Sequence, residues 1–245
     1  MAKQKKFKQK RKLFFRFIKK IIRVRYKRPE FIFLGKEFEN GAIILSNHEG
    51  TDAPLSLELY AQAPIRFWGA YEMNSKLPLL YKYQSKVYYH QKKHWPLFLS
   101  RLFCIIASPI TYLFYRGLNL ISIYPDARLS KTIKESVVAI ENGDNIVIFP
   151  EHSEDGYKEE LDGFFAGFTL LAERLYKKHG IDVPIYVSYF RKKDLKYIVD
   201  APVSYSSLIA GQRTREEIAD ILVKRCNELG KMDFSSADSH KKIEK

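Results

Sequence analysis

Short apolar runs rich in β-branched residues alternate with helical patterns along most of this chain, and that alternation restricts its fold more than any other feature. The runs cover residues 41–47, 65–71, 119–125, 145–151, 183–190 and 195–203. Strands of this kind, separated by helices, are typical of a parallel sheet that is buried on both faces. The sequence therefore predicts an α/β fold with a mostly parallel central sheet covered by helices.

Helical patterns occupy the segments between and after these runs, at residues 53–62, 130–143, 163–180 and 214–230. Ser130 is a candidate N-cap, and Gly143 and Gly180 stand where two of the helices are expected to end. We expect one domain over residues 30–232, followed by a frayed tail at 233–245.

The N-terminal arm, residues 1–29, carries the whole excess of positive charge. Its first 28 residues hold 14 of the 42 Lys and Arg residues and no Asp or Glu, so the other 28 basic residues balance the 28 acidic ones. Apolar side chains recur between these cations at helical spacing, at Phe14, Phe17, Ile18, Ile21 and Ile22. The pattern predicts a basic amphipathic helix that binds an anionic membrane surface. A basic tail that aids solubility or contacts RNA is the alternative, but the apolar stripe favours a membrane over nucleic acid.

Residues 97–115 are almost entirely apolar, with Arg101 as the one charged residue. The 19-residue length suits a transmembrane helix. A single span would place the segments on either side of it on opposite sides of the bilayer, which conflicts with one α/β domain over residues 41–203. We expect a helix that lies at the membrane surface, with a buried helix and a true span as alternatives.

His48 and Asp52 follow the first apolar run, where an open α/β sheet places its ligands. If residues 48–52 form one helical turn, both side chains lie on the same face. An Asp that accepts a hydrogen bond from one ring nitrogen leaves the other nitrogen free to act as a base on a hydroxyl. Alternatively, Asp52 caps the following helix and His48 bonds to the backbone.

A metal site is a weaker interpretation of the same stretch. The sequence HEGTD resembles the zinc motif H-E-x-x-H with Asp in place of the second His, and Glu151, His152, Glu154 or Asp155 would have to supply a further ligand. This spacing matches no strong metal site, so we expect none. A serine hydrolase is disfavoured because G-x-S-x-G does not occur. The two cysteines lie far apart in sequence and indicate a reducing compartment.

Four segments, SNHEGTDAPL (46–55), RGLNLISIYPD (116–126), NIVIFPEHSED (145–155) and VPIYVSY (183–189), resemble in order and spacing the four sequence blocks of the glycerolipid acyltransferases. The resemblance is to the lysophosphatidic acid acyltransferase branch and covers about residues 40–205. It implies that His48 is the general base and Asp52 its orienter. The acceptor hydroxyl would then attack an acyl thioester without a covalent enzyme intermediate.

The resemblance also implies the rest of the site and its partners. Asn47, Phe149, Pro150, Glu151 and Ser153 match block residues that bind or position substrate. The acceptor would be a lysophospholipid and the donor acyl-CoA or acyl carrier protein, with no tightly bound cofactor. Such an enzyme of phospholipid biosynthesis would be peripheral or monotopic, at the cytoplasmic face of a membrane.

The chain departs from the family pattern in two respects. Three residues rather than four separate His48 from Asp52, which rotates Asp52 by about 100° if the stretch is helical. Either another local arrangement restores the contact, or Asp52 serves another purpose. Both arginines on the phosphate side are also missing. Their candidate replacements are Arg116, Arg128, Lys131 and Lys158, of which we include Arg128 and Lys131 in the expected substrate site. A different acceptor, such as a glycolipid or a non-phosphorylated lysolipid, or an inactive lipid-surface binding protein, therefore stays open.

Overall fold

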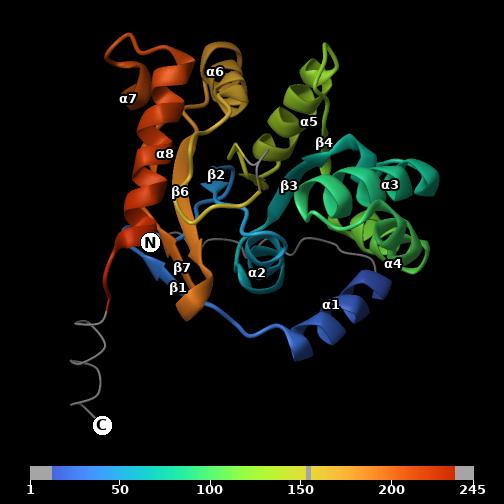
Figure 1. The fold of residues 1–245 in the computed structure, drawn as a ribbon. Helices are drawn as coiled ribbons and strands as arrows, with labels where there is room; N and C mark the ends of the chain where they lie inside the picture. Colours follow the sequence, from blue (N-terminus) through green and yellow to red (C-terminus); the bar gives the residue numbers. More distant parts are fainter. Residues whose placement is uncertain (1–12, 153–155, 235–245) are drawn as a thin grey trace, which may run out of the picture.

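A computed structural model describes residues 13–152 and 156–234 of the chain, and an eight-stranded sheet forms the centre of this part (Figure 1). The strand order is β1-β7-β6-β2-β5-β3-β4, with β8 paired to β6. Only the β6–β7 and β6–β8 pairs are antiparallel. The predicted mostly parallel α/β fold is thus confirmed. The strands are β1 (Glu30–Phe33), β2 (Ile43–Ser46), β3 (Ile65–Ala70), β4 (Ile121–Ile123), β5 (Asn145–Ile148), β6 (Pro184–Arg191), β7 (Lys196–Val199) and β8 (Val203–Ser204).

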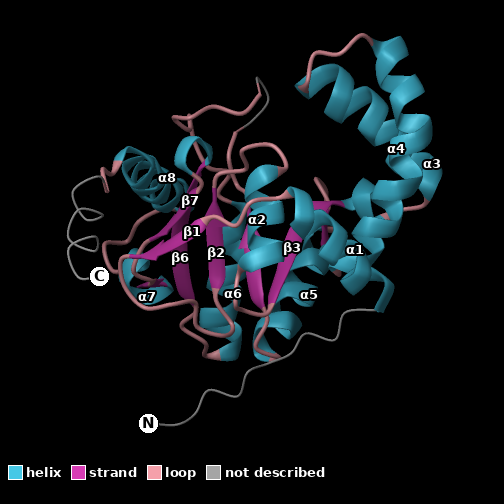
Figure 2. Cartoon of the chain, turned by 90° about the horizontal axis from the view of Figure 1, so that it is seen from below, coloured by secondary structure: helices cyan, strands magenta, loops and turns pink. Residues whose placement is uncertain are grey.

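Helices cover both faces of the sheet (Figures 1 and 2). One face packs against α5 (Leu129–Glu141), α6 (Gly167–His179), α7 (Tyr205–Ile209) and α8 (Arg215–Lys231). The other face is covered by α2 (Asp52–Tyr60), with a contribution from α1 (Leu13–Arg25). In β2, Ile43 and Leu45 face the first core and Ile44 faces the second, all fully buried. This alternation with two buried faces explains why the strand reads as a continuous apolar run.

The connection from β3 to β4 is a helical excursion that projects away from the sheet (Figure 2). It comprises η1 (Tyr71–Asn74), α3 (Leu77–Tyr83), η2 (Gln84–Lys92) and α4 (Leu97–Leu118). The sequence predicted only the last of these. The η2 segment is π-helical over its nine residues. Such turns are rare and occur frequently at functional sites.

Several boundaries differ from the predicted ones for local reasons. The α5 helix begins at Leu129, and the Ser130 hydroxyl donates to the Ala127 carbonyl instead of capping the helix. The run at 195–203 forms two strands, because Pro202 lies between β7 and β8 and has no N–H for a ladder. The α8 helix starts as predicted, with a capping box between Thr214 and Glu217. The short elements β1, α7 and η3 (Lys192–Asp194) were not predicted. Most of the tail expected to fray, residues 235–245, lies outside the described residues.

The arm helix α1 packs on the C-terminal part of α4. Phe15 is fully buried, with its ring centroid 5.4 Å from that of Phe114. A Cβ atom at Gly117 would collide with the Phe15 ring, so glycine is required for this close approach. Phe17 and Ile21, which belong to the predicted apolar stripe, are exposed on the side of α1 away from this contact.

Candidate active site

The register of the sheet brings His48 and Glu151 to one edge. Leu45 of β2 and Ile148 of β5 are paired, and each is followed three residues later by one of these two side chains. Because the two strands are parallel, both chains leave the sheet at its carboxyl edge, where open α/β sheets bind ligands.

The His48 imidazole lies between two aromatic rings. Its centroid is 4.8 Å from that of Phe149, and 4.9 Å from that of Tyr157, which stacks on it at 20°. Burial lowers the pKa of His48 to about 4, and the positive charges of Lys92 and Lys93 act in the same direction. The ring is therefore neutral at pH 7. Its Nδ1 atom is buried and has no hydrogen-bond partner among residues 13–152 and 156–234.

Glu151 is a buried carboxyl group whose hydrogen-bonding capacity is not used. The residue is 5% exposed, and neither carboxyl oxygen has a hydrogen-bond partner within the described chain. Burial raises the pKa of Glu151 to about 7, and the backbone N–H of His48, which lies near the carboxyl group without reaching hydrogen-bond geometry, offsets part of that rise. A buried polar group without a partner is rare and costly, and at the carboxyl edge of an open α/β sheet it makes Glu151 a candidate substrate-binding residue. A substrate hydroxyl at this position would satisfy it.

Asp52 is bonded to Tyr26 and Lys192 and makes no hydrogen bond to His48. The Tyr26 hydroxyl donates to Oδ1 at 2.7 Å, and Lys192 Nζ lies 2.8 Å from Oδ2. Burial alone would raise the pKa of Asp52, but these two partners outweigh it and the pKa is lowered. Asp52 is the first residue of α2, and residues Glu49 and Gly50 form a left-handed turn with φ of 39° and 66° instead of a helical one. The short spacing left open either a restored contact with His48 or another purpose for Asp52, and the structure shows Asp52 bonded elsewhere.

Asn47 fastens the start of this turn to β6. Its side chain is fully buried, its Nδ2 donates to the Phe190 carbonyl at 3.0 Å, and the Phe190 N–H donates to its Oδ1 at 2.7 Å. Both ends of the Asn47 amide are thus bonded to the backbone of β6, and these bonds fix the residue that precedes His48. Pro150 is likewise buried, and its carbonyl accepts from the Phe165 N–H.

Arg128 and Lys131 lie away from His48. Arg128 is paired with Asp126 at 2.7 Å and its guanidinium lies over the rings of Tyr71 and Tyr124, beyond the end of β4. Lys131 is an exposed residue of α5. Two strands, β5 and β3, separate β4 from β2, which corresponds to about 14 Å at the usual strand spacing. Ser153 lies outside the described residues.

Two lysines that the sequence analysis missed lie beside the site instead. Lys92 ends η2 and Lys93 follows it, and their Nζ atoms are 5.9 and 5.7 Å from the centroid of the Tyr157 ring that covers His48. Lys93 Nζ also lies close to Gly50. The tandem of lysines after a tyrosine-rich stretch was the only sequence signal for them. Tyr26, Tyr157 and Lys192 were also missed.

The described residues include no group of three or more His, Cys, Asp or Glu side chains arranged to hold a metal ion. His152, considered as a zinc ligand, is exposed and its ring packs against Phe165 with centroids 4.2 Å apart. Cys104 and Cys226 are buried free thiols.

No family model matches this chain, and no curated protein matches it. Among solved structures, it is similar to the 1-acyl-sn-glycerophosphate (LPA) acyltransferase PlsC from Thermotoga maritima, at 13% sequence identity and a TM-score of 0.47. The similarity covers 84% of this chain and 74% of the other.

Proposed function

We propose that this protein is an acyltransferase that moves a fatty acyl group from an acyl thioester to the hydroxyl of a lysophospholipid. The observation that supports this most directly is that a half-buried, neutral His48 and the unsatisfied carboxyl group of Glu151 come to the same edge of the sheet. The resemblance of four sequence segments to the glycerolipid acyltransferases points to the same chemistry. The proposed donor is acyl-CoA or acyl carrier protein, and the proposal needs no tightly bound cofactor.

In this reaction His48 acts as the base. A ring nitrogen takes the proton of the acceptor hydroxyl while the oxygen attacks the thioester carbonyl carbon. The new C–O bond forms, the C–S bond breaks, and the imidazolium returns its proton to the departing thiolate. Glu151, whose pKa is about 7, holds the acceptor by a hydrogen bond and orients its hydroxyl toward His48.

Lys92 and Lys93 are proposed to take the place of the missing phosphate-side arginines. Both lower the pKa of His48, so their positive charge reaches the imidazole. A phosphate bound beside them would neutralise that charge and raise the pKa of His48 toward the range in which imidazole is an effective base. This coupling favours an acceptor with a phosphate group, such as lysophosphatidate, over an uncharged lysolipid.

We also propose that the enzyme lies on a membrane surface, and the composition and exposure of α4 are the main support for this. This helix is long and apolar enough to cross a membrane by length and composition, with a mean hydropathy of 1.8, yet only 17% of its most apolar window is buried. A core helix of a soluble domain would be mostly buried. Its exposed side chains form one broad apolar face: Phe98, Leu99, Leu102, Phe103, Ile105, Ile106, Ile110 and Leu113.

The position of α4 in the chain argues against a span. The excursion leaves from β3 and returns to β4, and these strands are parallel neighbours in one sheet. Gln84 and Thr111 bind η2 to α4 by hydrogen bonds, so the returning helix is packed on the outgoing one. Figure 2 shows α1 beside α4, and α1 adds exposed Phe17, Ile21 and Val24 among its cations. We therefore propose that α1 and α4 together lie in an anionic cytoplasmic membrane surface.

The test is an acyl-transfer assay on purified protein. Labelled acyl-CoA or acyl carrier protein is supplied with lysophosphatidate, other lysophospholipids or monoacylglycerol, and the products are separated. We expect transfer by the wild type and none by His48→Ala. His179→Ala serves as the matched control, because this side chain is paired with Glu141 far from the site. If the wild type were inactive with every donor and acceptor, the proposal would be wrong.

A lipid-surface binding protein without activity is the second candidate, and one observation favours it. In a His–Asp pair the carboxylate orients the ring, whereas here Asp52 is bonded to Tyr26 and Lys192. Binding to anionic vesicles by both wild type and His48→Ala, with equal inactivity, would support this candidate.

A further inference from the structure

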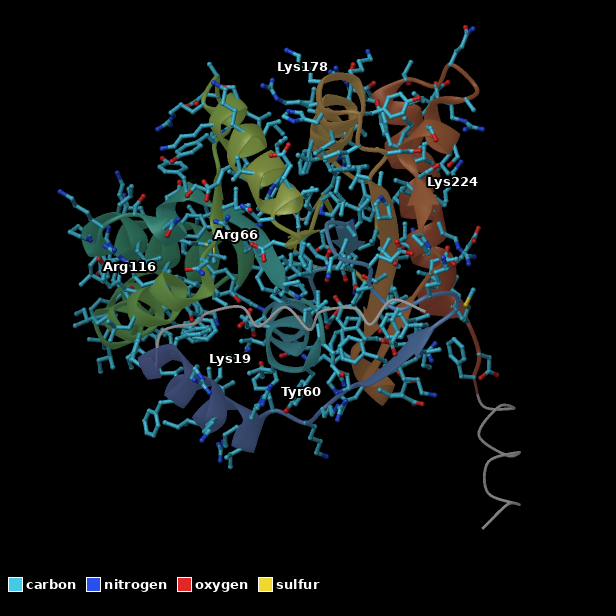
Figure 3. The ribbon with its side chains drawn as sticks, turned by 180° about the vertical axis from the view of Figure 1, so that it is seen from behind. Lys19, Tyr60, Arg66, Arg116, Lys178 and Lys224 are labelled. Atoms are coloured by element: carbon cyan, nitrogen blue, oxygen red, sulfur yellow. The ribbon has the colours of Figure 1, made fainter. Side chains whose placement is uncertain are left out.

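The N-terminal arm is bound to α2 by partly buried polar contacts. Lys19 Nζ lies 2.8 Å from Glu58 Oε1, with side chains that are 20% and 3% exposed. Lys19 also donates to the Glu58 carbonyl, and Arg23 donates to the Leu59 carbonyl. Both carbonyls belong to the last turn of α2, which lacks helical partners and attracts cations. Figure 3 shows both Lys19 and Tyr60 in the region where α1 meets α2.

Tyr26 extends this contact from the arm to the candidate active site. Its carbonyl accepts from the Tyr60 hydroxyl, and its own hydroxyl donates to Asp52 Oδ1. Burial, followed by the bond to Asp52, raises the pKa of Tyr26, so the phenol stays protonated and acts as a donor. The other oxygen of Asp52 is held by Lys192, which directly follows β6. The Asp52 carboxylate is therefore bonded both to Tyr26 of the arm and to Lys192 at the end of a central strand.

The turn between these fastenings is strained. Glu49 has a φ of 39°, a left-handed value that a residue other than glycine keeps only when its surroundings hold it there. Asn47 fastens one end of the turn to Phe190, and Asp52 fastens the other end to Tyr26 and Lys192. His48 lies between the two ends, so its orientation depends on both.

We infer that Tyr26 is a positioning residue of this active site. Acting through Asp52, it holds the 47–52 turn so that the His48 ring stays between Phe149 and Tyr157. The arm is thus part of the catalytic unit as well as a membrane anchor. This inference rests on the proposed acyl transfer, because it concerns the same site.

The test compares Tyr26→Phe in the full chain with Tyr112→Phe, which removes a hydroxyl bonded to Arg116 on α4. Thiol release is measured without membranes, with a short-chain acyl thioester and a short-chain lysophosphatidate that are both soluble. Loss of a hydrogen bond to a charged group predicts a fall in kcat of about tenfold for Tyr26→Phe. We expect an unchanged KM, unchanged binding to anionic vesicles, and wild-type values throughout for Tyr112→Phe.

A second readout is independent of activity. The ring protons of His48, assigned in NMR spectra by their loss in His48→Ala, should shift in Tyr26→Phe and not in Tyr112→Phe. Wild-type kcat without membranes, with a loss seen only on vesicles, would show that the arm is an anchor alone and overturn the inference. If the wild type transfers no acyl group, the proposed function fails. The His48 resonances then decide: a shift supports positioning by Tyr26, and no shift overturns it.

Discussion

Asp52 and Lys192 form an ion pair at 2.8 Å. The Asp52 carboxylate, which the resemblance assigned to orienting His48, is therefore bonded to Lys192 instead. In a working His–Asp pair, loss of the carboxylate costs about 10⁴-fold in kcat, because the ring loses its tautomer and orientation. Here Asp52 acts on the turn rather than on the ring. We therefore predict that Asp52→Asn lowers kcat by only about tenfold to a hundredfold, measured beside His48→Ala. A loss as large as that of His48→Ala would mean that Asp52 turns to His48 during catalysis.

Glu151 should make the protein less stable at neutral and alkaline pH. Its pKa is about 7 in the folded chain and 4.5 in the unfolded one. Between these values the unfolded chain has released the proton and the folded chain has not, so stability falls as the pH rises from 4.5 to 7 and stays low above. A pKa difference of about 2.5 corresponds to a loss of about 3 kcal/mol in the free energy of unfolding.

Glu151→Gln removes this penalty, because the amide stays neutral. We predict that its free energy of unfolding exceeds that of the wild type by about 2–3 kcal/mol at pH 8 and is nearly equal at pH 4.5, while acyl transfer is lost. Urea denaturation at both pH values measures this. Glu160→Gln, which changes an exposed carboxylate paired with Lys231, is the control and should gain nothing with pH. An equal effect of Glu151→Gln at both pH values would contradict the assigned pKa.

The sequence predicted this site in part, because the pairing of strands in a parallel sheet determines which loops come together. The β-branched runs indicated β2 and β5, and parallel pairing of two such runs is sufficient to bring His48 and Glu151 to one edge. Lys92 was not foreseen because η2 is π-helical and shows no helical periodicity in its sequence. Tyr26 and Lys192 reach Asp52 from elements that only the folded chain brings together, and no local pattern encodes such a contact.

A substitution of Lys93 should show whether the acceptor carries a phosphate group. We predict that Lys93→Gln raises the KM for lysophosphatidate about tenfold, since one charge-assisted contact to a phosphate is lost, and leaves the KM for monoacylglycerol unchanged. Steady-state kinetics with both acceptors measures this. Lys86→Gln, on the exposed side of η2, is the matched control. An equal change for both acceptors would show that Lys93 binds the donor or supports the fold.

Ile106 should contribute to membrane binding without contributing to the fold. It lies on the apolar face of α4 and is 72% exposed, so Ile106→Asp costs little packing in water. On a bilayer the same change removes an apolar side chain worth about 1.5–3 kcal/mol when buried, and places a charge next to anionic lipids. We predict that the partition coefficient onto anionic vesicles falls about tenfold to a hundredfold, with an unchanged unfolding midpoint in solution. Val138→Asp is the matched control, because Val138 is exposed on α5 across the sheet from α1. Since membrane contact is assigned to α1 and α4 alone, a similar loss of vesicle binding in Val138→Asp would contradict that assignment.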